Sequence, residues 1–110
     1  MRQSHTTVLE RNVCWQHDFT TEPYEVGWAS EALFFVRTLS VEKLPVGVYA
    51  RVQISPDGIH WCAEGSELPI ASEPGVTFCR VTQFGGWLRL VGQIPDDAEV
   101  KVLVYLVLKE

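Results

Sequence analysis

The sequence predicts an all-β protein, a single-domain antiparallel β-sandwich of about eight strands. Three observations support this: 26 of the 110 residues are Val, Ile or Thr, hydrophobic and polar residues alternate along several segments, and glycine or proline separates those segments. Jelly-roll connections are one way to join such strands, and a closed small barrel is the alternative architecture. The length suits one domain and excludes a barrel enzyme or a two-domain dinucleotide enzyme.

The first 30 residues have the least regular pattern, and we expect them to pack on the sandwich or to extend from it. Within them, residues 8–15 suggest one strand, broken at Arg11 and Asn12, and residues 24–28 suggest another after Pro23. Residues 28–33 form the one segment in which a helical turn is plausible. The expected organisation is therefore a regular sandwich preceded by an irregular N-terminal segment.

From Leu33 onward, hydrophobic and polar residues alternate with the period of two that is typical of a half-buried antiparallel strand. In the first such strand, Arg37 interrupts a side that otherwise holds Leu33, Phe35, Leu39 and Val41. A turn follows at residues 43–47. The next strand then has one apolar side, made of Val48, Ala50, Val52 and Ile54.

A hairpin turn is predicted at residues 55–58, because Pro56 presets the first turn dihedral, Asp57 can bond the backbone, and Gly58 tolerates a left-handed conformation. The return strand carries Ile59, Trp61 and Ala63 on one side. Three further strands are expected at residues 76–83, 87–91 and 100–109, separated by turns at 85–86 and 95–97.

Residues 55–61, with the sequence Ser-Pro-Asp-Gly-Ile-His-Trp, resemble the Asp-box hairpin of sialidases and other β-propellers. That motif is a Ser-x-Asp-x-Gly turn followed by Thr-Trp; in this sequence glycine follows Asp57 directly and His60 replaces the threonine. The resemblance implies a structural turn tied to a buried aromatic side chain. A propeller is excluded by the length, so no function is transferred.

The net charge is −5 and the isoelectric point is about 5.1, so the chain lacks the basic surface that a nucleic-acid partner requires. No membrane partner is expected, because the longest nearly apolar run, residues 100–108, is interrupted by Lys101 and is shorter than the roughly 20 residues of a membrane-spanning helix. The N-terminal residues show no signal-peptide pattern. We therefore expect a cytoplasmic or particle-associated protein with reduced cysteines; a Cys62–Cys79 disulfide is the alternative.

Two pairs of zinc-type ligands occur in the sequence, Cys14 with His17 and His60 with Cys62. Neither pair has the spacing of a zinc knuckle, so no metal and no cofactor are expected. A nucleophilic Cys62 would need His60 as its base, but the two side chains stand parallel on an extended strand, a poor geometry for proton transfer. The chain is thus predicted not to be an enzyme; a small zinc- or thiol-dependent enzyme is the least favoured alternative.

The outer sides of the strands, opposite the expected core, carry the functional prediction. In the last strand the even-numbered residues from Val100 to Leu108 fill the core side, yet the centre of the outer side is also apolar. Mixed Trp, Tyr, Arg and aliphatic side chains are typical of interaction hot spots. Arg89 is expected beside Trp87 and Tyr105. The predicted interface comprises Tyr49, Arg51, Trp87, Arg89, Val91, Leu103, Tyr105 and Val107.

Three occupants could cover this predicted interface. A partner protein or a second copy of the chain is favoured. The N-terminal segment, with Val13, Trp15 and Phe19, could instead fold over it. The third alternative is a carbohydrate-binding module in which a sugar stacks on Trp87, Tyr49 or Tyr105.

Residues 47–109 resemble the small β-sandwich modules of bacteriophage virions and related self-assembling particles. The resemblance rests on the Asp57–Gly58 hairpin with Trp61, the strand that begins at Trp87, and the all-apolar final strand. It implies a structural or decoration role in repeated copies. The predicted function is that of a non-enzymatic structural or interaction protein that forms homo-oligomers or binds other structural proteins.

Overall fold

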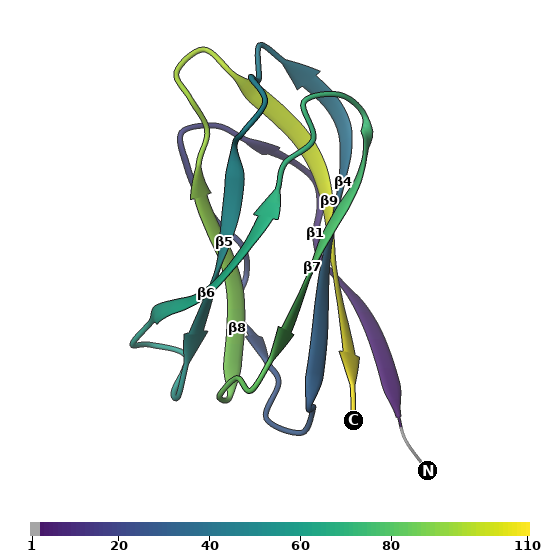
Figure 1. The fold of residues 1–110 in the computed structure, drawn as a ribbon, viewed down its shortest axis with the longest axis vertical. Helices are drawn as coiled ribbons and strands as arrows, with labels where there is room; N and C mark the ends of the chain where they lie inside the picture. Colours follow the sequence, from purple (N-terminus) through teal and green to yellow (C-terminus); the bar gives the residue numbers. More distant parts are fainter. Residues whose placement is uncertain (1–2) are drawn as a thin grey trace.

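Two antiparallel sheets pack face to face in the computed structural model, which describes residues 3–110 (Figure 1). The first sheet, called sheet A, has the strand order β1-β9-β4-β7, and the second, called sheet B, has the order β2-β8-β5-β6 with β3 also paired to β8. The prediction of an all-β sandwich is confirmed. The strands are β1 (Ser4–Trp15), β2 (Asp18–Thr20), β3 (Tyr24–Glu25), β4 (Glu31–Glu42), β5 (Tyr49–Ser55), β6 (Cys62–Pro69), β7 (Gly75–Thr82), β8 (Trp87–Gln93) and β9 (Glu99–Lys109).

The strand order is that of a jelly roll, because the chain crosses to the opposite sheet after every strand except β2 and β5. β2 and β3 are two parts of one interrupted strand, since both pair with β8. Between them, Thr21 donates its amide to the Leu90 carbonyl at 2.9 Å and accepts the Leu90 amide on its hydroxyl at 2.9 Å. Pro23, which has no backbone donor, follows this contact. The nine strands thus correspond to the eight of a jelly roll.

The core lies between the inner sides of the two sheets and is built on β9. All even-numbered residues of β9 from Val100 to Leu108 are fully buried, as are Phe34 and Val36 of the adjacent β4. Leu88 and Leu90 of β8 face them from sheet B and are equally buried. Burial of each such side chain contributes about 1.5–3 kcal/mol, so this column supplies much of the stability.

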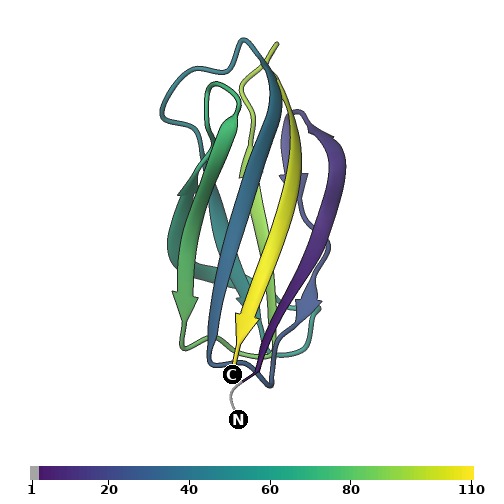
Figure 2. The same ribbon diagram turned by 90° about the vertical axis from the view of Figure 1, so that its right-hand side faces the viewer.

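The N-terminal segment is regular, contrary to the sequence-based prediction. Residues 4–15 form β1, which pairs with β9 at the edge of sheet A (Figure 2). Trp15 and Phe19 stack at a centroid distance of 3.9 Å inside the core, where they are 2% and 7% exposed. The predicted break at Arg11 and Asn12 coincides with a β-bulge, and Asn12 has a φ of 54°. This segment therefore completes both sheets and does not cover an outer face.

Two further local predictions are corrected by the structure. Residues 28–33 contain no helical turn, because a turn at residues 27–28 leads directly into β4 at Glu31. The return strand of the hairpin begins at Cys62, so Ile59 lies in the loop and is 73% exposed. Across residues 3–110, no helix is long and apolar enough to cross a membrane.

Gly92 of β8 lets the Phe19 ring pack directly on the backbone of sheet B. A Cβ atom at Gly92 would lie 2.6 Å from Cζ of Phe19 and 3.3 Å from the Tyr49 carbonyl oxygen. Real Cβ atoms do not approach other atoms this closely, so a larger residue must displace the Trp15–Phe19 stack.

We expect Gly92→Ala to lower the free energy of unfolding by about 1–3 kcal/mol through this overpacking. Chemical denaturation measures the change. Gly75→Ala in β7 is the matched control, because the nearest atom to its Cβ would be the Glu73 carbonyl oxygen at 3.9 Å. Equal effects of the two substitutions would contradict the proposed role of the Phe19 contact.

Candidate interaction surfaces

The outer side of sheet A carries hydrophobic residues on all four of its strands. One row of directly paired residues crosses the sheet, from Val8 of β1 through Tyr105 of β9 and Phe35 of β4 to Phe78 of β7. The rows on either side of it add more hydrophobic residues. We call this surface the apolar face of sheet A; it comprises Val8, Leu33, Phe35, Val76, Phe78, Leu103, Tyr105 and Val107.

The apolar face is partly open to solvent, most of all at β7. Val76 is 60% exposed and Phe78 is 44% exposed, whereas the residues on β4 and β9 are half-buried by their neighbours. The Phe35 and Phe78 rings are 5.8 Å apart, and the Arg80 guanidinium lies 5.0 Å from the Phe78 centroid. Arg37 of β4 pairs with both Val76 and Leu103, so it interrupts the face on a central strand. A surface of aromatic and aliphatic residues with two arginines has the composition of a protein interface.

The eight predicted interface residues do not form one surface. Leu103, Tyr105 and Val107 belong to the apolar face of sheet A, but the other five lie on β5 and β8, in sheet B. The outer sides of the two sheets point in opposite directions, so Arg89 does not lie beside Tyr105. The prediction grouped β8 with β9 because they are consecutive, and the jelly-roll connection places consecutive strands in different sheets.

The sheet B residues of the predicted interface contact one another and the hairpin loop. The Arg89 guanidinium lies 4.1 Å from the Trp61 centroid, and its Nε donates to Gln53 Oε1 at 2.8 Å. Partial burial lowers the pKa of Arg89 from its ordinary value. The Trp87 ring lies against Gly58, where an added Cβ would be 3.1 Å from the indole. Trp87 and Arg89 therefore hold the hairpin on sheet B, and Tyr49, at 46% exposed, is the most open aromatic of the predicted set.

Five residues of the apolar face were not in the predicted interface: Val8, Leu33, Phe35, Val76 and Phe78. The sequence contains a signal for two of them, since Leu33 and Phe35 alternate with the equally apolar Phe34 and Val36. Phe34 and Val36 are fully buried, which turns Leu33 and Phe35 outward. β4 and β9 are both apolar on both sides, and they pair with each other. Two such strands side by side would have predicted a wider hydrophobic surface.

The loop that resembles an Asp box is held by its own side chains. Ser55 Oγ accepts the amides of Asp57 at 3.2 Å and Gly58 at 2.8 Å and donates to Asp57 Oδ1 at 3.0 Å. Asp57 Oδ1 also accepts the amides of Ile59 and His60, each at 2.9 Å, while Oδ2 lies 2.7 Å from His60 Nδ1. Gly58 has a φ of 79°, as the turn prediction requires. The loop is thus a closed structural unit in which His60 is already engaged.

Backbone and side-chain hydrogen bonds from His60, followed by the Ile59 amide, hold the pKa of the Asp57 carboxyl well below its usual range. A carboxyl group with a lowered folded-state pKa contributes its full stability at neutral pH. That contribution is lost as the pH falls below the ordinary aspartate pKa of about 4.

The candidate metal and thiol groups are separated in space. Cys14 and His17 lie near the end of β8 at Gln93, whereas His60 and Cys62 lie near its start at Trp87. Within residues 3–110, no group of three or more His, Cys, Asp or Glu side chains is placed to hold a metal ion. All three cysteines are free thiols. Burial and the nearby Glu64 charge raise the pKa of Cys79 to about 11, which keeps this thiol protonated and unreactive.

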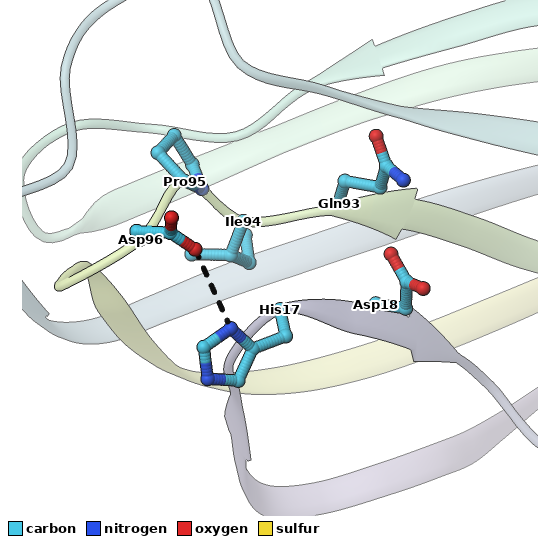
Figure 3. A pocket seen from close by; sticks show the side chains of 6 residues that line it. All are labelled: His17, Asp18, Gln93, Ile94, Pro95 and Asp96. Carbon is cyan, nitrogen blue, oxygen red and sulfur yellow. Dashed lines mark ion pairs between the residues drawn. The ribbon is translucent and has the colours of Figure 1, made fainter.

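A polar hollow of about 570 Å³ lies at the end of the sandwich where β2 begins and β8 ends (Figure 3). We call it the end hollow; it is lined by His17, Asp18, Gln93, Ile94, Pro95 and Asp96. His17 Nδ1 lies 3.8 Å from Asp96 Oδ1, and the His17 carbonyl accepts the Ile94 amide at 2.7 Å.

The chain matches no known protein-family model and no curated protein, so a function can be inferred only from the fold and from these surfaces.

We expect the stability difference between the wild type and Asp57→Asn to shrink as the pH is lowered from about 5 to about 2, because over this range the Asp57 carboxyl takes up a proton in the unfolded chain while its lowered pKa keeps it charged in the folded protein. Urea denaturation at a series of pH values measures it. Asp97→Asn removes the same charge from the β8–β9 turn and is the matched control. If both variants show the same pH dependence, the Asp57 hydrogen bonds do not stabilise the folded state as stated.

Proposed function

We propose that this protein is a non-enzymatic structural protein that assembles with copies of itself through the apolar face of sheet A, in a virion-like structural or decoration role. The observation that carries the proposal is the continuous row of Val8, Tyr105, Phe35 and Phe78 across the sheet. The inner side of the same sheet already supplies the core. The outer hydrophobic residues are therefore not needed for folding, and burial of each in a contact is worth about 1.5–3 kcal/mol.

The size of sheet A suits a second copy of the chain. Its four strands, spaced about 4.8 Å apart and about 11 residues long at roughly 3.3 Å per residue, span a surface of about 700 Å². Stable protein interfaces bury about 800 Å² on each partner. A second copy that covers the whole outer side of sheet A, charged ends included, would therefore come close to this size.

The pattern on sheet A is also self-complementary. A two-fold axis between β4 and β9, parallel to the strands, would exchange these two central strands between copies. Because Phe35 pairs with Tyr105 and Glu31 pairs with Lys109 within one chain, the axis would set Tyr105 near Phe35 of the second copy and Lys109 near its Glu31. Aromatic residues would then meet aromatic residues, opposite charges would meet at one end, and Arg37 would lie opposite Leu103 of the second copy.

The architecture supports the structural role by analogy only. Jelly-roll sandwiches of this kind form viral capsid domains as well as lectins and cupins, so the fold alone does not decide between these functions. The partly open apolar face distinguishes the assembly hypothesis, because its hydrophobic residues favour a protein partner.

In light scattering coupled to size-exclusion chromatography, we expect the wild type to have a mass that is a multiple of 12.4 kDa. Tyr105→Glu combined with Phe78→Glu should give particles of 12.4 kDa, because two charges would be buried in the contact. Far-ultraviolet circular dichroism should still report a folded β protein.

Trp28→Glu is the control for this experiment, because it adds a charge at an aromatic residue that is 43% exposed in a turn outside the apolar face. Its mass should equal that of the wild type. A wild type that remains at 12.4 kDa at every concentration would refute self-assembly. An assembly that survives the double substitution would place the contact elsewhere.

A further inference from the structure

A second recognition feature lies on sheet B, at the end opposite the Asp57 loop. Asp18 of β2 pairs directly with Gln93 of β8, and the pairing of Ala50 with Gly92 brings Tyr49 next to Gln93 on the other side. Ala50, Gly92 and Phe19 are buried, so the alternating side chains of Asp18, Gln93 and Tyr49 point outward in one row. Tyr49 pairs in turn with Pro69 and is 46% exposed.

This row adjoins the end hollow, to which Asp18 and Gln93 also belong. Figure 3 shows these two side chains on adjacent strands and the His17–Asp96 pair on the neighbouring loops. The hollow, at about 570 Å³, is within the usual range for small-molecule sites. An open aromatic ring thus stands beside a concave surface that presents carboxylate, amide and imidazole groups.

The chemistry of these groups restricts the ligand. Asp18 and Asp96 line the hollow and no Lys or Arg does, which disfavours an anion. A cation would pair with the carboxylates but would make no use of the Gln93 amide donors. Adjacent hydroxyl groups both donate and accept hydrogen bonds, so they satisfy the carboxylates and the amide together. The C–H face of a sugar ring can also stack on an aromatic ring such as Tyr49.

We propose that the end hollow and Tyr49 form a binding site for a neutral saccharide. The sugar ring stacks on Tyr49, and its hydroxyl groups bond to Asp18, Gln93 and Asp96. This site is on the opposite side of the molecule from the apolar face of sheet A, so it does not depend on self-assembly. Of the three aromatic residues that the sequence offers to a sugar, only Tyr49 belongs to this site, because Trp87 packs on the hairpin and Tyr105 belongs to sheet A.

The proposal can be tested by two-dimensional ¹H–¹⁵N NMR of the full chain with glucose, galactose, mannose or N-acetylglucosamine, and with spermidine as a cationic probe. Concentrations of about 50 mM would detect the millimolar Kd values typical of single sugars, a binding free energy near −4 kcal/mol. At least one sugar should shift the amides of residues 17–18, 49, 93–94 and 96. Tyr49→Ala and Gln93→Ala should each weaken that binding tenfold or more.

Trp28→Ala is the matched control, since it removes an equally exposed aromatic ring outside the hollow and should leave the sugar affinity unchanged. The spectrum of each variant also reports whether it is folded. The proposal is wrong if none of the four sugars shifts these amides, if only spermidine does, or if Tyr49→Ala and Gln93→Ala both bind as the wild type does. Light scattering on Tyr49→Ala should show the wild-type mass, which separates this result from a failure of the assembly proposal.

Discussion

The alternation of side chains along β9 is the constraint on which the rest of the structure depends. β9 lies between β1 and β4, and its five even-numbered residues from Val100 to Leu108 are fully buried. A shift of one residue in its pairing would turn this column to the outside, so the core fixes the register of both neighbouring strands. The same register aligns Val8, Tyr105 and Phe35 in one outward row. The candidate interface is therefore a direct consequence of how the core is packed.

The sequence predicted the buried side of a strand wherever its other side was polar. Ala50 and Val52 of β5 and Leu88 and Leu90 of β8 are buried as expected, because Arg51 and Arg89 occupy the opposite sides. β4 could not be oriented in this way, since both of its sides are apolar. In addition, a bulge between Thr38 and Ser40 reverses its alternation, so that Val41 packs against the core while Leu33 and Phe35 point outward. A bulge of this kind has no clear signal in one sequence.

The candidate site depended on which strands share a sheet, and local patterns do not contain that information. β8 and β9 are consecutive and both have apolar outer residues, yet they belong to opposite sheets. The contact between Arg89 and Trp61 joins a residue of β8 to a loop that is distant in the sequence. The arrangement of strands in the jelly roll is needed to tell which outer side chains contact the hairpin on sheet B and which remain open to a partner on sheet A. The composition of the candidate interface was thus partly predictable, but its extent and its position on one sheet were not.

If a second copy covers the apolar face of sheet A, isotope-filtered nuclear Overhauser spectroscopy will detect the contact between the two chains. Labelled and unlabelled chains are mixed, so that only contacts between different copies give signals. The account predicts intermolecular signals between the Tyr105 and Phe35 rings, which the proposed two-fold axis brings together. Intermolecular signals confined to sheet B residues such as Arg51 and Val91, or none at all, would contradict it.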